Sequence, residues 1–226
     1  MIIFRKIQEA LTEDRLRPYG QCNANLRLVL ARCLWNIAIC ESLYTPLHLA
    51  EVSLRNSINT NLTEQFSRPD WYEDIHLLAP WQIEQLTLAK QRIQKNGKSV
   101  TAAEVVAELS LGFWTGFFNK TNARSGLGHS LAAHVFPYAP RHEKDLRKID
   151  YRWKRIRDLR NRVFHHERII HWKDLDLQHE AIIEAISWIS PEVHLMSVRL
   201  DRFKGTRNQG VGPWVEVVNQ IVDSPL

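Results

Sequence analysis

The sequence contains little cysteine and no long apolar run. Its three cysteines, Cys22, Cys33 and Cys40, are odd in number and form no Cys-x-x-Cys pair, which argues against a disulfide framework or a zinc site. No stretch approaches the ~18 apolar residues of a membrane span. Residues 1–6 already include the charged residues Arg5 and Lys6, and the apolar segment of a signal peptide is lacking. We therefore expect a cytoplasmic protein that uses no membrane, metal or cofactor.

No stretch of the sequence keeps the period-two alternation of apolar and polar residues that is typical of a β-strand. Spacings of three and four residues instead predict helices over 2–16, 25–44, 47–66, 81–94, 102–109, 131–136, 143–166 and 174–189. The expected fold class is therefore all-α, with one helical domain over 1–196 and a peripheral, partly irregular C-terminal extension over 197–226. In that extension, residues 204–213 have the composition of a mobile linker. Residues 214–222 form either a docked helix or a tail that joins a partner.

Two local patterns refine this expectation. Thr45 and Pro46 have the order of an N-cap followed by the first helical position, which predicts that a new helix begins there. Thr101 and Glu104 form a capping box for the helix after residue 101. Residues 110–118 are the most aromatic part of the chain, and a corner of the core explains them better than a ligand site.

The positive charge is concentrated in one stretch. Between residues 141 and 173 there are twelve Lys and Arg against five Asp and Glu, an excess of seven, whereas the net charge of the whole chain is +5. The rest of the chain is therefore slightly acidic. A local basic field of this kind favours a polyanionic partner.

The basic stretch ends in residues 160–167, Arg-Asn-Arg-Val-Phe-His-His-Glu. Arg160 falls on the apolar stripe of a helix that also carries Ile149, Trp153, Ile156 and Val163. A guanidinium on such a stripe has to be paired or has to face a cleft.

Asn161 and His165 are four residues apart, so the amide can orient the imidazole. Arg160 can bind the charged phosphate, Asn161 can orient the imidazole and His165 can transfer a proton. Together such groups suffice to cleave a phosphodiester without a metal, provided that the ribose 2′-OH is the nucleophile.

On an ideal helix Arg160 and His165 are about 140° apart, and one histidine cannot serve as base and acid at the same moment. A second copy across a twofold axis would supply the missing groups, so we expect a homodimer. The alternative is a buried Arg–His pair that only joins helices. His166 and Glu167 either tune His165 or cap the end of the helix.

These residues resemble the Arg-Asn-x-x-x-His signature of HEPN domains, and more specifically the Abi-like (abortive infection) branch. Four further segments match in the expected order: residues 14–19 (DRLRPY), 34–36 (LWN), 49–58 (LAEVSLRNSI) and 106–114 (VAELSLGFW). Together the matching segments extend over most of residues 10–190.

The resemblance implies a helical, usually dimeric fold with metal-independent endoribonuclease activity, acting in phage defence or as a toxin controlled by a protein or RNA antitoxin. It places catalysis on Arg160, Asn161 and His165. Supporting or RNA-binding roles fall to Arg162, His166, Glu167, Glu51, Arg55 and Asn56. Two other interpretations stay open: an RNA- or nucleotide-binding helical module that does not cleave, and a purely structural protein.

Overall fold

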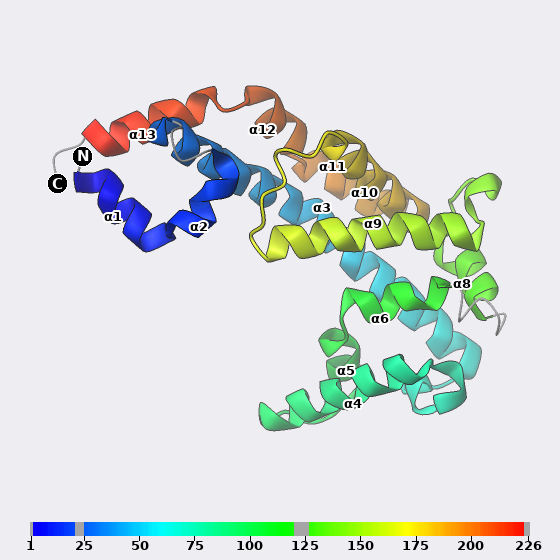
Figure 1. Cartoon of the computed structure of the whole chain (residues 1–226). Helices are drawn as coiled ribbons and strands as arrows, with labels where there is room; N and C mark the ends of the chain where they lie inside the picture. The colour runs from blue at the N-terminus through cyan, green and yellow to red at the C-terminus, as the bar shows by residue number, and fades with distance from the viewer. Residues whose placement is uncertain (1, 21–24, 120–126, 224–226) are drawn as a thin grey trace. The chain divides into compact units, whose positions relative to one another are not determined.

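The computed structural model describes residues 2–20, 25–119 and 127–223, and every regular element in these ranges is a helix. The predicted all-α class is confirmed. Cys22 lies outside the described ranges. The α-helices are α1 (Ile2–Leu11), α2 (Glu13–Leu16), α3 (Leu26–Phe66), α4 (Pro80–Lys95), α5 (Ala102–Glu108), α6 (Leu111–Thr115), α8 (Leu127–Val135), α9 (Leu146–Phe164), α10 (Leu175–Ile189), α11 (Pro191–Leu200), α12 (Phe203–Gln209) and α13 (Gly212–Asp223) (Figure 1).

The chain divides into two compact units. Unit 1 contains Met1–Pro46, Leu159–His179 and Leu200–Leu226, and unit 2 contains Leu47–Asp158 and Glu180–Arg199. The first and the last of the described helices, α1 and α13, therefore both belong to unit 1. A separate extension beginning at residue 197 stays a prediction.

A single helix, α3, replaces the two helices expected on either side of Pro46. It is 41 residues long and contains Pro46 in its interior, so the prediction that a new helix begins there was wrong. An interior proline removes one backbone hydrogen bond and costs about 3 kcal/mol. Leu43, Leu47 and Ala50 around it are at most 1 % exposed, and each buried leucine contributes about 2 kcal/mol. Burial of the flanking residues therefore keeps the helix continuous.

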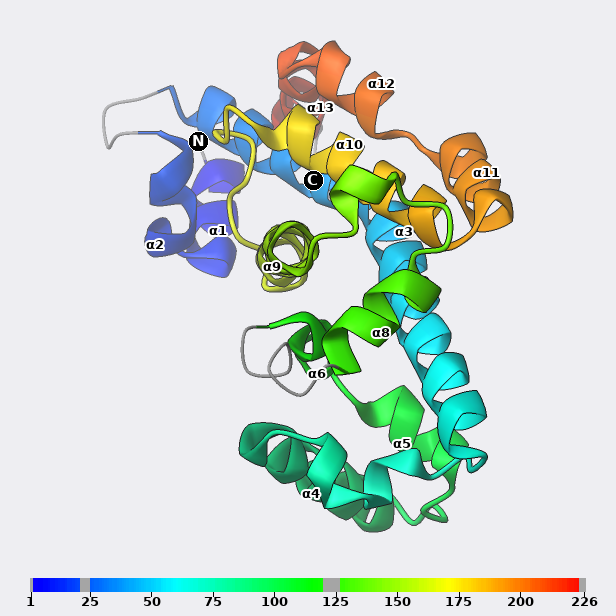
Figure 2. The same ribbon diagram turned by 90° about the vertical axis from the view of Figure 1, so that its right-hand side faces the viewer.

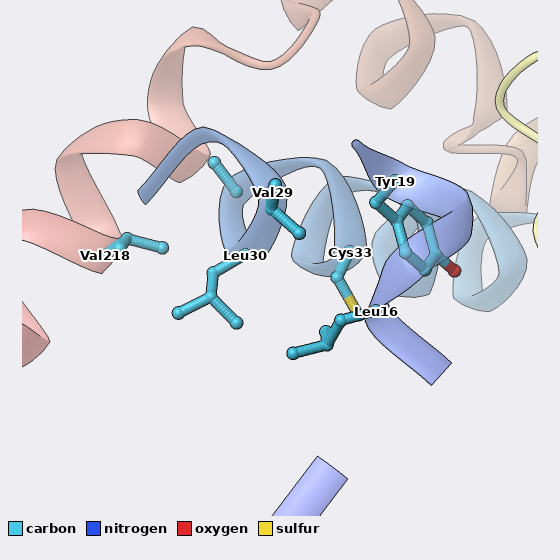
Figure 3. Packing of buried hydrophobic residues seen from close by; sticks show 7 residues of the cluster. Leu16, Tyr19, Val29, Leu30, Cys33 and Val218 are labelled. Carbon is cyan, nitrogen blue, oxygen red and sulfur yellow. The ribbon is translucent and has the colours of Figure 1, made fainter. Parts of the chain in front are cut away.

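The core of unit 1 forms where the N-terminal segment and α13 meet the first turns of α3. Its buried members are Leu16, Tyr19, Val29, Leu30, Ala31, Cys33 and Val218 (Figure 3). α13 lies beside the start of α3 (Figure 1), where the Arg27 guanidinium bonds Asn219 at 2.6 Å and Asp223 at 3.1 Å. Cys33 is thus a small core residue.

The predicted linker over residues 204–213 is mostly helix, because α12 occupies Phe203–Gln209. Phe203 is fully buried and stacks on His179 with ring centroids 4.4 Å apart. The Trp35 indole N–H donates to the carbonyl of Thr206 at 3.2 Å. These tertiary contacts fix a segment whose composition alone favours mobility. Of the docked helix and the partner-joining tail expected at 214–222, the structure has the helix, α13.

Unit 2 is organised around aromatic residues. Trp71, Phe113, Trp114 and Phe117 are fully buried, and their rings meet edge to face with centroids 5.1–6.2 Å apart. The expected core corner in residues 110–118 is therefore confirmed. α4 and α5 lie side by side in both views (Figures 1 and 2). The side chain of Thr101 accepts from the Glu104 N–H, which makes it the N-cap of α5, as predicted.

The basic helix α9 has the predicted apolar stripe. Ile149, Trp153, Ile156 and Val163 are buried, whereas Arg160 on the same stripe is half-buried. The helix ends at Phe164 and not at His166. His165 and His166 therefore belong to the turn that follows.

Two glycines predict opposite effects of the same substitution. A Cβ at Gly116 would lie 2.4 Å from ring atoms of Trp81, whereas a Cβ at Gly205, inside α12, would meet nothing within 4 Å. We expect Gly116→Ala to lower the free energy of unfolding by about 1–3 kcal/mol through overpacking. Gly205→Ala is expected to raise it by about 0.5–1 kcal/mol through helix propensity. Urea unfolding followed by circular dichroism checks both, and a change of the same sign at the two positions would contradict the packing.

Candidate functional site

The end of α9 is closed by a Schellman motif. His166 has a φ of 57°, in the left-handed region where glycine is usual. The Glu167 N–H bonds the Arg162 carbonyl at 2.9 Å, and the His166 N–H bonds the Val163 carbonyl at 3.1 Å. His166 therefore has a structural position, and the predicted capping role is the one that the geometry supports.

Arg160 lies against an aromatic surface. Its guanidinium carbon is 4.4 Å from the centroid of the Phe164 ring, a cation–π distance. One guanidinium N–H donates to the Asn161 side-chain oxygen at 3.5 Å. Phe164 in turn stacks on Tyr44, with centroids 5.4 Å apart. The planar face of the guanidinium is thus supported, which suits a group that presents its edge to a phosphate.

His165 is exposed and directly follows α9. Its backbone N–H still bonds the Asn161 carbonyl at 2.9 Å, so the chain keeps helical geometry up to this residue. Within the described ranges, the Asn161 side chain bonds Arg160 and makes no hydrogen bond to the His165 ring. The expected amide–imidazole contact is therefore absent from this part of the structure, and the imidazole faces solvent.

Glu167 and Arg162 are partners of each other. Their side chains form an ion pair, and both residues also contribute backbone groups to the Schellman motif. The carboxylate of Glu167 is thus held by Arg162. This contact explains Glu167 as a brace for the turn, with no tuning of His165 required.

Asn36 holds the segment that follows the turn, a role that the sequence did not indicate. Its side chain is 2 % exposed. The side-chain oxygen accepts from the backbone N–H of Ile169 at 2.8 Å and of Ile170 at 3.2 Å, and the amide nitrogen donates to the Glu167 carbonyl at 3.1 Å. In the sequence Asn36 is marked only as the last residue of the matching segment 34–36, beside the apolar face of its helix.

Two arginines join the N-terminal segment to the same turn. The Arg15 guanidinium donates to the carbonyl of His166, and the Arg168 guanidinium donates to the carbonyl of Pro18. Both bonds connect residues 14–19, one of the matching segments named above, with the end of the signature segment. Residues 14–19 therefore support the turn from the N-terminal side.

Glu51, Arg55 and Asn56 lie on α3 within unit 2. Arg55 donates from Nε to the Asn56 side-chain oxygen at 3.3 Å. Glu51 and Arg55 are both half-buried, and Asn56 is exposed. Their participation in a site with Arg160 stays a prediction.

Burial raises the pKa of three groups near the turn. The pKa of Tyr19 rises to about 12 and that of Cys40 from 9.0 to about 11, in each case mainly through desolvation. Desolvation also raises the pKa of the Cys33 thiol. The charge of Arg15 opposes the shift in all three. Both cysteines are therefore neutral thiols at neutral pH, which is typical of unreactive structural cysteines.

Comparison with known proteins gives no relatives: no family model, curated protein or solved structure matches the chain. Within the described ranges, no helix is both long and apolar enough to cross a membrane. In the same ranges no group of three or more His, Cys, Asp and Glu side chains is placed to hold a metal ion.

The buried Asn36 amide predicts a large stability effect. Asn36→Leu should lower the free energy of unfolding by about 2–4 kcal/mol, because it leaves backbone N–H groups of a buried segment without an acceptor. Asn61→Leu is the matched control, since among the described residues the Asn61 side chain bonds only the carbonyl of Ser57 on its own helix, at 2.8 Å. That change should cost less than about 1 kcal/mol. Urea unfolding measures both, and equal effects would contradict a bracing role for Asn36.

The pKa of Cys40 predicts a pH dependence. Because the folded-state pKa is the higher one, stability is complete below pH 9 and falls as the pH rises from 9 towards 11, where the unfolded chain ionises first. Cys40→Ala removes this contribution. Between pH 8 and pH 10 the unfolding free energy of wild type should fall by about 1 kcal/mol more than that of Cys40→Ala. Parallel pH profiles of the two proteins would count against the raised pKa.

Proposed function

We propose that the protein is a metal-independent endoribonuclease that cleaves RNA through the ribose 2′-OH. The observation that carries the proposal is the end of α9: a half-buried Arg160 supported on the Phe164 ring, followed at the turn by an exposed imidazole. In this mechanism His165 assists removal of the 2′-OH proton or protonates the leaving 5′-oxygen. Arg160 stabilises the charge that develops on the phosphate.

Asn161 contributes to this mechanism through Arg160. Its side-chain oxygen accepts a hydrogen bond from the guanidinium and so helps to fix the direction in which the guanidinium N–H groups point. His165, by contrast, needs a further group to set its orientation. In the proposal, that group comes either from the RNA or from a second copy of the chain. The proposal includes a homodimer. Two copies also provide one histidine as base and another as acid.

The proposed biological role follows from the resemblance of residues 160–167 and the accompanying segments to the Abi-like HEPN proteins. On that basis the ribonuclease acts in the cytoplasm as a toxin or phage-defence effector. A cognate antitoxin, protein or RNA, then restrains it.

A second candidate is an RNA- or nucleotide-binding module that does not cleave. The observation that favours it is the engagement of Asn161 with Arg160, because among the described residues the His165 ring then has no partner that would align it for proton transfer. In this candidate Arg160 is a phosphate contact and His165 is a surface residue.

Cleavage of RNA in excess chelator tests the proposal. We expect wild type to yield ends with a 2′,3′-cyclic phosphate, and His165→Ala to lower the rate by about 10²–10⁴-fold, the usual contribution of a general acid or base. A substrate with deoxyribose on the 5′ side of the cleavage site should resist, because it lacks the nucleophile. His76→Ala, which removes another exposed histidine, should cleave at the wild-type rate.

Three other results would count against this mechanism. Cleavage by His165→Ala at the wild-type rate would remove His165 from catalysis. Salt-dependent RNA binding without cleavage by any folded variant would support the second candidate, since phosphate contacts release counterions. Neither binding nor cleavage would leave a structural role for Arg160 and His165.

A further inference from the structure

Unit 1 contains a cavity of about 630 Å³ beside the turn that ends α9. A volume of this size is typical of small-molecule sites. Its walls come from α1, α2, α3, α13 and the end of α9, and they include Ile7, Leu30, Leu34, Cys40, Phe164 and Val218. Leu30 and Val218 also belong to the buried cluster in Figure 3. The cavity therefore opens from the core of the unit itself.

The mouth of the cavity is also apolar. Leu11, Ile37, Tyr44 and Ile221 all line it, and each is between 43 % and 56 % exposed. Large apolar side chains that gather at the opening of an apolar cavity mark a binding site more often than chance exposure does. A ligand that fills the cavity and covers this mouth must be mainly hydrocarbon, because the lining offers few polar partners.

One cation is placed to select the polar end of such a ligand. Arg15 lines the cavity, and its positive charge acts on Tyr19, Cys33 and Cys40 within the same wall. A guanidinium has five N–H donors, and the bond to the His166 carbonyl uses one of its nitrogens. The remaining donors can bind an anion.

The acid at the cavity does not cancel this charge. Glu41 is the carboxylate among the lining residues, but its side chain is 66 % exposed and pairs with Arg202 at 3.3 Å. Arg15 is therefore the cation of the cavity, and Glu41 is directed to another partner.

We propose that this cavity binds an elongated apolar small molecule with one anionic head group, a carboxylate of the fatty-acid type. The hydrocarbon chain lies among Leu30, Leu34 and Val218, and the carboxylate lies on Arg15. Neither the RNA-cleavage mechanism nor the resemblance assigns a ligand to these residues.

The bound molecule also touches the proposed catalytic end of α9. Phe164 forms part of the cavity wall, and its ring is the surface on which the Arg160 guanidinium rests, 4.4 Å from the ring centroid. Arg15 joins the head group to the carbonyl of His166, the residue after His165. Occupancy of the cavity therefore changes RNA cleavage, a consequence that rests on the proposed function.

Binding is tested on the full chain without RNA, by calorimetry and thermal unfolding. The probes are laurate, 1-dodecanol and dodecylamine, which share a twelve-carbon chain and differ in the charge of the head group. We expect laurate to bind at a ratio of one to one and to raise the Tm, with dodecanol weaker and dodecylamine weakest. Arg15→Gln should weaken laurate about tenfold or more, the loss of one charge-assisted contact, and leave dodecanol within about twofold.

Two further variants give the controls. Arg17→Gln removes a nearby arginine that pairs with Asp14 and does not line the cavity, so laurate affinity should not change. Leu34→Trp fills the cavity and should abolish binding of laurate and dodecanol alike. If Leu34→Trp fails to fold, the comparison of Arg15→Gln with Arg17→Gln still decides.

Failure to bind laurate or dodecanol would overturn the site. Equal binding of laurate and dodecylamine, or laurate binding that is unaffected by Arg15→Gln, would overturn the anionic head group. Because binding is measured without RNA, absence of ribonuclease activity would leave the site standing and remove only the proposed function. Laurate that binds without altering RNA cleavage would remove only the coupling.

Discussion

The end of a helix leaves backbone groups without partners, and at the end of α9 the side chain of Asn36 supplies bonds for the segment that follows. Its amide accepts from two consecutive N–H groups and donates to the Glu167 carbonyl, and the Asn36 side chain itself is buried. Each such bond contributes only about 1 kcal/mol net, but the penalty for a buried unsatisfied group is larger. Asn36 therefore fixes the segment that directly follows the turn carrying His165 and His166, and Arg15 and Arg168 form further bonds in the same region.

The same turn brings two environments together. Phe164 supports the guanidinium of Arg160, stacks on Tyr44 and also forms part of the wall of an apolar cavity. The Arg160 guanidinium contacts an aromatic face and an amide oxygen, and the residue is only half-buried. The arrangement suits recognition of a phosphate from the solvent side. It also makes the position of Arg160 sensitive to whatever touches the Phe164 ring from the cavity.

Several parts of the fold could be predicted because they depend on local chemistry. The helical spacing of apolar residues, the cap at Thr101 and the buried aromatic corner at 110–118 follow from neighbours in the chain. The continuity of α3 through Pro46 and the helix α12 could not be predicted in this way. In both cases burial against distant residues, such as Phe203 on His179, outweighs an unfavourable local preference. The role of Asn36 was missed for the same reason, since its partners lie more than 130 positions away.

The sequence by itself determined the helical class, the concentration of positive charge around residues 141–173 and the placement of Arg160 on an apolar stripe of its helix, because each of these depends only on the order and spacing of residues. The tertiary structure decided where α9 ends, which groups the Arg160 guanidinium meets and which partners hold the turn. It also decided that Arg15 lines an apolar cavity. These features arise when side chains from α1, α2, α3, α9 and α13 come together, and their packing depends on contacts between residues that no local pattern records.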